Sequence, residues 1–324
     1  MKLLAPVSNF ASAKRQIEAG ANEIYVGADY NTFENFAFHA RSRYTNNMEK
    51  LCPDFYELKE MISFAHENNV RVMFAANTPL LADDPEGTND YETQFLNYVE
   101  EGIKAGADSI VLADLGAVLL IRGKGIKTHL TASTTIETTN IEQIKFFEEL
   151  GFNRIVLSYP VTLREVEELT RLSNLEVEVF GHFGCSFYDG YCNFKHPSPD
   201  GSGPFARIGL PCCNTYKVIK NGEEYKEGQY LNATQFCSVC SLIRLKMAGV
   251  HSIKIVGRDM NPEQNARITA VYAEILKFIN NSNDPMSIDI EAVKEKFLPE
   301  PWLQSFCKNN SCKYIDTTVT LSFI

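Results

Sequence analysis

Short runs of buried-type apolar residues alternate along the chain with longer segments whose apolar residues recur at helical spacing. The short runs are rich in β-branched residues and predict strands, and the longer segments predict amphipathic helices. The expected strands are Lys2–Val7, Glu23–Ala28, Arg71–Asn77, Ser109–Asp114, Lys127–Ser133, Arg154–Tyr159, Leu175–His182 and Ser252–Gly257. The expected helices are Phe10–Gly20, Asp54–Asn69, Tyr91–Gly106, Leu115–Lys124, Asn140–Gly151, Thr162–Ser173 and Pro262–Ile279.

Three of these helices end in a glycine that is followed at once by a strand, in EAGANEIYV, KAGADSIVL and ELGFNRIVL. Glycine accepts the left-handed conformation that ends a helix at low cost. Repeated strand–helix units with right-handed crossovers indicate a parallel sheet, and eight such units favour closure as a TIM-type (β/α)8 barrel. An open, doubly wound sheet is the alternative.

The repeat is interrupted once, between the seventh and the eighth strand. Residues 184–248 are rich in cysteine, glycine, proline and aromatic residues, and Asn221-Gly222 predicts a hairpin within them. We therefore expect a barrel over residues 1–280 that carries a cysteine-rich insertion at 184–248. A C-terminal tail, 281–324, follows with one short helix at Ile290–Phe297.

The charge and hydropathy of the chain limit its partners and its location. The 324 residues carry a formal net charge of −10. Binding of nucleic acid depends on neutralising phosphates with Lys and Arg, so an acidic chain makes nucleic acid the less favoured partner. The apolar run after Met1 is too short for a signal peptide, and no stretch is long and apolar enough for a membrane span. We expect a cytoplasmic protein.

Cysteine supplies the strongest chemical signal. The chain has nine cysteines, and six of them stand in the insertion: Cys185, Cys192, Cys212, Cys213, Cys237 and Cys240. An odd number of cysteines in a long chain that is not exported argues against a disulfide framework. Thiolates are soft ligands that suit iron–sulfur clusters and zinc. The spacing alone leaves both open.

Polar residues follow several expected strands, at the end where barrels build their active sites. They are Asn77, Asp114, the run from His129 to Thr135, and the run from Lys254 to Arg258. Each of them singly is more simply a helix cap, but their shared placement predicts a pocket. His182, three residues before Cys185, is a ligand, a proton donor or an ordinary loop histidine.

Several segments resemble peptidase family U-32, the collagenase-like peptidases. They include LLAPVSNFASAKRQIEAGANEIYVGA at the start, EVEVFGHFGCSFYDGYC, PCCNTY, and FCSVCSLIRLKMAGVHSIKIVGR. The resemblance extends over roughly residues 2–280. It implies a barrel that holds a [4Fe-4S] cluster, and members of the group act in oxygen-independent hydroxylation of ubiquinone precursors, tRNA or rRNA, some with prephenate as oxygen donor.

Matching residue by residue, the resemblance implies four cluster ligands: Cys185, Cys192, Cys212 and Cys237. Cys212 is favoured over Cys213 because it lies four residues before Tyr216, and Cys237 over Cys240 because it lies eleven residues before Ala248. The roles of Cys307 and Cys312 stay open. Zinc remains the alternative metal.

The chain departs from the family pattern at two positions near the expected pocket. Val256 stands where the family has Glu, and Thr135 where it has Gln. We predict an oxygen-independent hydroxylase, or a related redox enzyme, acting on a small or peptide-like substrate. Arg258 and Lys254 would hold an anion, because guanidinium and ammonium groups recognise carboxylates, and Asn77, His129 and Asp114 would orient it. A peptidase is one alternative. The other is a non-catalytic partner of a paralogous U-32 subunit.

Overall fold

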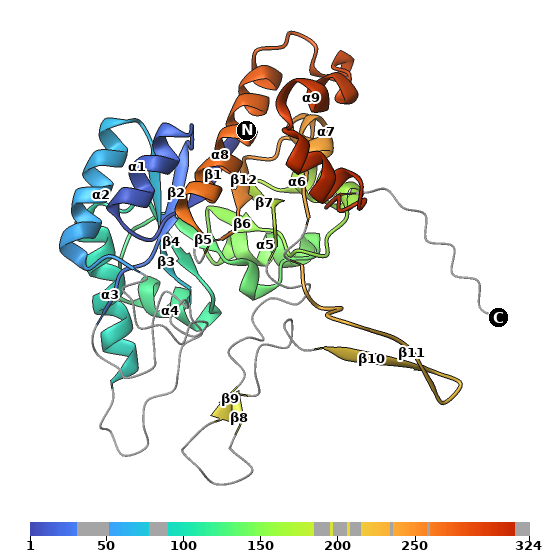
Figure 1. Ribbon diagram of the computed structural model, residues 1–324. Helices are drawn as coiled ribbons and strands as arrows, with labels where there is room; N and C mark the ends of the chain where they lie inside the picture. Colours follow the sequence, from blue (N-terminus) through green and yellow to red (C-terminus); the bar gives the residue numbers. More distant parts are fainter. Residues whose placement is uncertain are drawn as a thin grey trace.

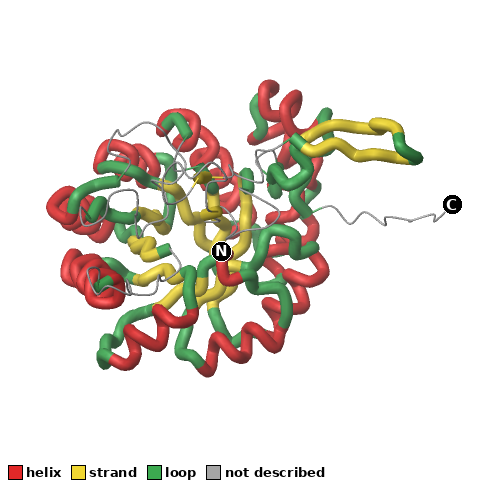
Figure 2. Tube along the Cα trace, turned by 90° about the horizontal axis from the view of Figure 1, so that it is seen from below, coloured by secondary structure: helices red, strands yellow, loops and turns green. Residues whose placement is uncertain are grey.

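The computed structural model describes residues 1–30, 52–77, 90–184, 215–233, 236–257 and 260–314, together with the backbone of two short strands at 195–196 and 206–207. Eight parallel strands close into a barrel in the order β1-β12-β7-β6-β5-β4-β3-β2. The expected TIM-type barrel is confirmed. Seen from one end, the ring of strands is surrounded by helices (Figure 2).

The barrel strands are β1 (Lys2–Pro6), β2 (Glu23–Val26), β3 (Arg71–Ala76), β4 (Ser109–Leu112), β5 (Leu130–Ala132), β6 (Arg154–Val156), β7 (Glu176–His182) and β12 (Ser252–Ile255). The helices between and after them are α1 (Phe10–Glu18), α2 (Phe55–Glu67), α3 (Tyr91–Ala105), α4 (Leu115–Gly123), α5 (Ile141–Glu149), α6 (Leu163–Leu172) and α8 (Pro262–Asn280). The observed elements match the expected ones to within a few residues at their ends.

The insertion separates β7 from β12 and departs from the repeat, as the sequence predicts. It contains β8 (Lys195–His196), β9 (Ala206–Arg207), β10 (Tyr216–Lys220), β11 (Glu223–Gly228), the 3-10 turn η4 (Val239–Ser241) and α7 (Leu242–Met247). The hairpin β10–β11 projects away from the barrel (Figure 1). Asn221 and Gly222 form its turn with φ of 54° and 84°, as the sequence predicts.

Capping side chains and glycines set the ends of the helices. Side chains of Asn9, Asp54, Asp90, Asp114, Asn140, Thr162 and Asn261 cap the starts of seven helices. The three glycines expected to end helices, Gly20, Gly106 and Gly151, all have positive φ. These local signals place each helix start and stop close to the residue that the sequence indicates.

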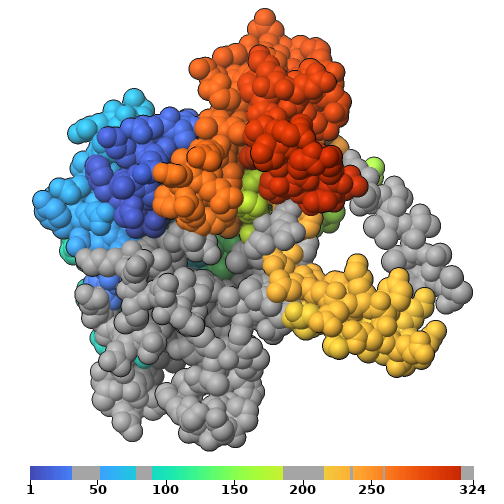
Figure 3. Space-filling view, in the orientation of Figure 1, coloured from blue at the N-terminus to red at the C-terminus, as the bar shows by residue number. Residues whose placement is uncertain are grey.

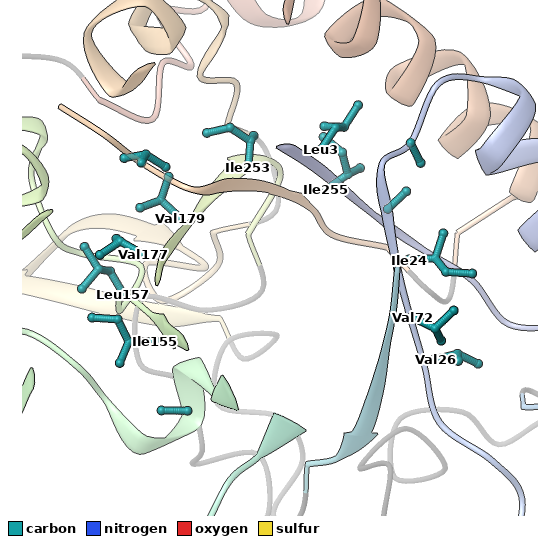
Figure 4. Packing of buried hydrophobic residues seen from close by; sticks show 14 of the residues in the cluster. Leu3, Ile24, Val26, Val72, Ile155, Leu157, Val177, Val179, Ile253 and Ile255 are labelled. Atoms are coloured by element: carbon teal, nitrogen blue, oxygen red, sulfur yellow. The ribbon is translucent and has the colours of Figure 1, made fainter. Parts of the chain in front are cut away.

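The main core lies between the barrel wall and the surrounding helices, where alternate strand residues point outward. Figure 4 shows such side chains, among them Val72, Val177 and Ile253. The tail joins the same core through α9 (Ile290–Phe297), α10 (Glu300–Trp302) and the π-helical turn η6 (Leu303–Cys307), which bury Val293, Leu298 and Trp302. In the space-filling view the red tail residues lie directly against the orange residues of the last part of the barrel (Figure 3).

Two helical glycines provide a matched test of this packing. A Cβ at Gly102 in α3 would lie 2.4 Å from Cδ1 of the buried Phe74, whereas a Cβ at Gly123 in α4 would meet nothing within 4 Å. We expect Gly102→Ala to lower the free energy of unfolding by about 1–3 kcal/mol through overpacking. Gly123→Ala should raise it by up to about 1 kcal/mol, because alanine is the better helix former. Urea denaturation measures both, and equal effects of the two substitutions would contradict the packing described here.

Candidate functional site

The carboxyl ends of the barrel strands carry Asn77, Asp114 and Ser133, as the sequence predicts. Asn77 follows β3 directly, and its buried Oδ1 has no hydrogen-bond partner among the described residues. An unsatisfied buried acceptor is costly and marks a position where a ligand would be favoured. Asp114 caps α4 by accepting a hydrogen bond of 2.7 Å from the Gly116 amide. It therefore stabilises the start of this helix, in addition to any role in binding a substrate.

Lys254 lies inside the barrel, below these strand ends. Its Nζ is 3.4 Å from Glu178 Oε1 and 4.6 Å from the centre of the Tyr25 ring, and the side chain is 15% exposed. The carboxylate and the aromatic face hold the ammonium group in the lumen. Lys254, which was predicted to bind an anion, therefore lies inside the barrel. The carboxylate of Glu178 balances its charge.

The floor of the lumen is a network of charges centred on Arg154. Arg154 in β6 donates two hydrogen bonds, of 2.7 and 2.8 Å, to Glu23 in β2, which is not a neighbouring strand, so the pair spans the barrel. It also contacts Glu176 at 2.8 Å and Glu178 at 3.2 Å, and Ser252 donates to Glu23 at 2.9 Å. Burial alone would raise the pKa of Glu23, but the hydrogen bonds and charge of Arg154 outweigh it, and the pKa is lowered.

His129 belongs to this floor, which corrects its expected position at a strand's carboxyl end. It precedes β5, and its Nδ1 is 2.9 Å from Ser109 Oγ at the amino end of β4. Its Nε2 is 3.9 Å from Glu176 Oε2. The expected strand Lys127–Ser133 begins only at Leu130. His129 therefore lies at the amino end of the barrel, opposite the carboxyl end that carries Asn77 and Asp114.

The floor predicts a stepwise loss of stability in acid. His251, whose Nε2 is 3.5 Å from Glu176, also belongs to the floor. Burial, reinforced by the nearby Arg71 and Arg154, lowers the pKa values of His129 and His251, so the unfolded chain binds protons first as the pH falls below about 6.5. The lowered pKa of Glu23 stabilises the fold above about pH 4.3, and this contribution is lost as the pH falls through its folded value. Urea midpoints between pH 8 and pH 3 test this. The double variant His129→Gln/His251→Gln should show a smaller first step, and the part that remains should come from the buried His182, whose pKa is also lowered. A wild-type midpoint that rises on acidification would contradict it.

The end of the insertion closes part of the barrel mouth. Ala233 packs with Val156, Tyr159 and Phe180, and Phe236 and Val256 lie against the same cluster. Gly184, which directly precedes Cys185, fits closely here, because a Cβ would lie 2.2 Å from Tyr159 Cε2 and 2.7 Å from the Ala233 carbonyl oxygen. The sequence therefore needs glycine at the point where the chain enters the first cysteine segment.

Cys237 is the one expected cluster ligand among the described residues. The backbone of Cys237 forms an isolated antiparallel β-bridge with His182 at the end of β7. Beside it, the Phe183 amide donates a hydrogen bond of 2.8 Å to the Phe236 carbonyl. Cys237 is 7% exposed, and its thiol accepts a long hydrogen bond of 3.8 Å from the Tyr272 hydroxyl, which also donates to the Gly181 carbonyl at 2.8 Å. Burial raises the pKa of this thiol to about 11.

His182 is buried among aromatic rings. Its ring lies 4.6 Å from that of Trp302, 5.0 Å from Phe306 and 5.6 Å from Tyr272, measured between centroids. Burial lowers its pKa to about 3, so the ring is neutral at physiological pH. The ring is thus packed among aromatic side chains, and its buried Nε2 has no hydrogen-bond partner among the described residues. The remaining expected residues, Cys185, Cys192, Cys212 and Arg258, lie outside the described residues, as does Cys213.

The family model for Peptidase family U32 matches residues 8–311. The chain belongs to this family. The expectation drawn from the sequence segments is confirmed over nearly the whole chain.

Three curated relatives show the range of names within the U32 family. The chain is 26% identical over 86% of its length to the 23S rRNA 5-hydroxycytidine C2501 synthase of Escherichia coli, and it spans 40% of that protein. It is 23% identical over 56% of its length to the tRNA hydroxylation protein P of Escherichia coli, and 24% identical over 89% to the collagenase of Porphyromonas gingivalis. It spans 51% and 68% of those two proteins.

Two residues inside the U32 barrel were not predicted from the sequence to belong to the site. Tyr25 and Glu178, which hold Lys254, were not among the expected site residues. A signal exists in EVEVFG, where acidic residues alternate with valine along a strand that should be buried. Within the described part of the chain, no helix has the length and hydropathy to cross a bilayer.

Proposed function

We propose that this U32 protein holds a [4Fe-4S] cluster on Cys185, Cys192, Cys212 and Cys237 and catalyses an oxygen-independent hydroxylation or a related redox modification. The family match and the names of the RNA-hydroxylating relatives support the class of reaction. A bound cluster would supply one-electron transfer. Zinc on the same thiols is the alternative metal.

The observation that carries the proposal is the position of Cys237. Its backbone pairs with His182. Cys185 follows His182 by three residues, and three residues of extended chain span at most about 11 Å. Cys237 therefore lies beside the residues that directly precede the expected ligand Cys185, which is itself outside the described residues. The donor set also suits the cluster, because iron–sulfur clusters are bound by cysteine thiolates.

The surroundings of Cys237 suit a metal-bound sulfur as well. The Tyr272 hydroxyl donates to the sulfur, and such hydrogen bonds help to set the reduction potential of a cluster. Burial raises the pKa of the thiol, so a cation is needed to hold it as thiolate, and metal ions do this readily. Water is largely excluded at 7% exposure.

Above the floor, Lys254 and Arg258 would hold an anionic substrate or oxygen donor, and Asn77 and Asp114 would orient it. The unpaired Oδ1 of Asn77 supports its part in this arrangement. His129 is left out because it lies at the opposite end of the barrel. We favour a small or peptide-like substrate, since a net charge of −10 disfavours binding of RNA phosphates.

The test is a comparison of products. The protein and its Cys237→Ser variant are produced anaerobically in a bacterial host without U32 proteins of its own. Digested RNA, peptides and small-molecule extracts are then searched by mass spectrometry for species heavier by one oxygen atom. A small molecule or peptide modified only with the wild-type protein is the expected result. A modified nucleoside would transfer the proposal to RNA, and no oxygenated species in any fraction would contradict hydroxylation.

A peptidase is the second candidate, because one relative is named a collagenase. Peptide hydrolysis needs an activated nucleophile or a metal-bound water. Cleavage of gelatin by the anaerobically prepared protein, lost in Lys254→Met and kept in Arg15→Met on the outer surface, would favour this candidate. The non-catalytic alternative predicts instead that the protein co-purifies with a U32 paralogue and is inactive alone.

A further inference from the structure

The tail brings a lysine to the carboxyl end of the barrel. The Cys237 amide donates to the Ser311 carbonyl at 3.0 Å, and the Lys313 amide donates to the Cys237 carbonyl at 2.8 Å. The ammonium group of Lys313 donates a hydrogen bond to the carbonyl oxygen of Tyr159, which follows β6. It also lies 4.2 Å from the centres of the Tyr159 and Tyr314 rings. Lys313 is therefore held at the barrel mouth by the same segment that pairs with Cys237.

The charge of Lys313 has no counter-charge within the described ranges. No described carboxylate forms an ion pair with it, and burial lowers its pKa to about 7 without a contribution from a charged neighbour. By contrast, Lys254 in the lumen lies 3.4 Å from Glu178 Oε1. One carbonyl and two aromatic rings stabilise the ammonium group only in part, because a buried charge is costly unless it is paired. The surroundings of Lys313 therefore favour an anion beside it.

The ring of Tyr159 connects Lys313 to the segments that carry two expected ligands. Gly184, the residue before the first expected ligand, lies against this ring, since a Cβ there would be 2.2 Å from Tyr159 Cε2. The ring of Phe236, the residue before Cys237, has its centre 6.3 Å from the centre of the Tyr159 ring. The ammonium group and the starts of both ligand segments therefore lie around one aromatic side chain.

We propose that Lys313 offsets the negative charge of a metal–thiolate centre that includes Cys237. The inference rests on the proposed function for the presence of that centre. Four thiolates outweigh the positive charge of Zn²⁺ or of an oxidised [4Fe-4S] core, so the centre is anionic with either metal. Charges attract each other more strongly in a site of low dielectric than in water. Because one-electron reduction adds a further negative charge, the Lys313 ammonium group favours the reduced form.

The experiment compares the anaerobically purified wild-type protein with three variants. Lys313→Met removes the charge, Lys313→Arg keeps it, and Lys308→Met removes an exposed charge from the same tail. The midpoint potential is measured by reductive titration with redox dyes and EPR spectroscopy. For Lys313→Met we expect an equilibrium constant for reduction at least about tenfold lower, which is a shift of about 59 mV to more negative potential. Lys313→Arg and Lys308→Met should stay close to the wild type.

The bland alternative is a lysine that only fastens the tail to Tyr159. Equal potentials of the wild type and Lys313→Met would overturn the inference in its favour. If Lys313→Met does not retain the cluster, retention in Lys313→Arg and an unchanged urea midpoint of metal-free Lys313→Met would support charge compensation. A lowered urea midpoint of that metal-free variant, or loss of the cluster in Lys313→Arg as well, would contradict it.

The outcomes for the inference and for the proposed function can be told apart. A [4Fe-4S] cluster whose potential does not respond to Lys313→Met leaves the proposed function standing and refutes the inference. Zinc without sulfide in the wild type refutes the proposed function, and the affinity for Zn²⁺ is then measured by competition with a chelator. At least about tenfold weaker zinc binding in Lys313→Met than in Lys308→Met, the shift expected for a lost buried counter-charge, would leave the inference standing. A wild-type protein that binds neither metal would refute both.

Discussion

Arg154→Met is expected to lower the free energy of unfolding by about 3–5 kcal/mol. The guanidinium group is fully buried and is the common partner of Glu23, Glu176 and Glu178. Removing it leaves the fully buried Glu23 without its main cation and leaves Glu178 with Lys254 alone. Breaking a buried ion pair on one side costs far more than the pair itself contributes, because the remaining charge stays desolvated.

Urea denaturation measures this effect, with Arg15→Met as the matched control. Arg15 forms an ion pair of 3.0 Å with Glu263 but is 48% exposed, so its loss should change stability by less than about 1 kcal/mol. If Arg154→Met does not fold, Glu23→Gln in the same background should restore part of the stability, because it removes one of the stranded charges. Equal effects of Arg154→Met and Arg15→Met would refute the importance of the floor.

Cys237→Ser is expected to abolish cluster binding, whereas Cys240→Ser should leave it in place. The two cysteines are three residues apart, and only Cys237 is buried and faces Tyr272. A serine hydroxyl is a hard, weakly acidic ligand that replaces a thiolate poorly in an iron–sulfur site. The iron and sulfide content of anaerobically purified variants measures the difference. Loss of the cluster in Cys240→Ser with retention in Cys237→Ser would reverse the ligand assignment.

The barrel was predictable from the sequence because its signals are local. The helices that follow the barrel strands start with a capping side chain such as Asn9 or Asp54, and helix ends such as Gly106 carry a glycine with positive φ. Counting the resulting units gave the eight strands that the structure closes into a ring. These features depend on a few neighbouring residues and not on the arrangement of distant ones.

The position of a residue along a strand was less predictable. His129 was expected at the carboxyl end of its strand and lies at the amino end of the barrel, because β5 has only three residues and pairs Leu130 with Ile110. Lys254 is the next-to-last residue of β12, near the strand end where it was expected, but its contact with Glu178 in the lumen was not predicted. Register between neighbouring strands decides these depths, and a single strand's sequence does not specify it.

Contacts between segments that are distant in the sequence could not be predicted. Nothing near Cys307 or Cys312 indicates that the tail reaches Cys237, because the contact depends on the packing of Trp302 and Phe306 around His182. The partners of Arg154 were hidden in the same way, since Glu23 is 131 residues away. Such contacts follow only from the closed barrel.

The most direct test of the central claim is iron and acid-labile sulfide analysis of the anaerobically purified wild-type protein, combined with Mössbauer spectroscopy. The proposed function predicts a brown protein with about four iron atoms and about four sulfides per chain, and the spectrum of a [4Fe-4S] cluster. A colourless protein that contains zinc and no sulfide after the same preparation would contradict it.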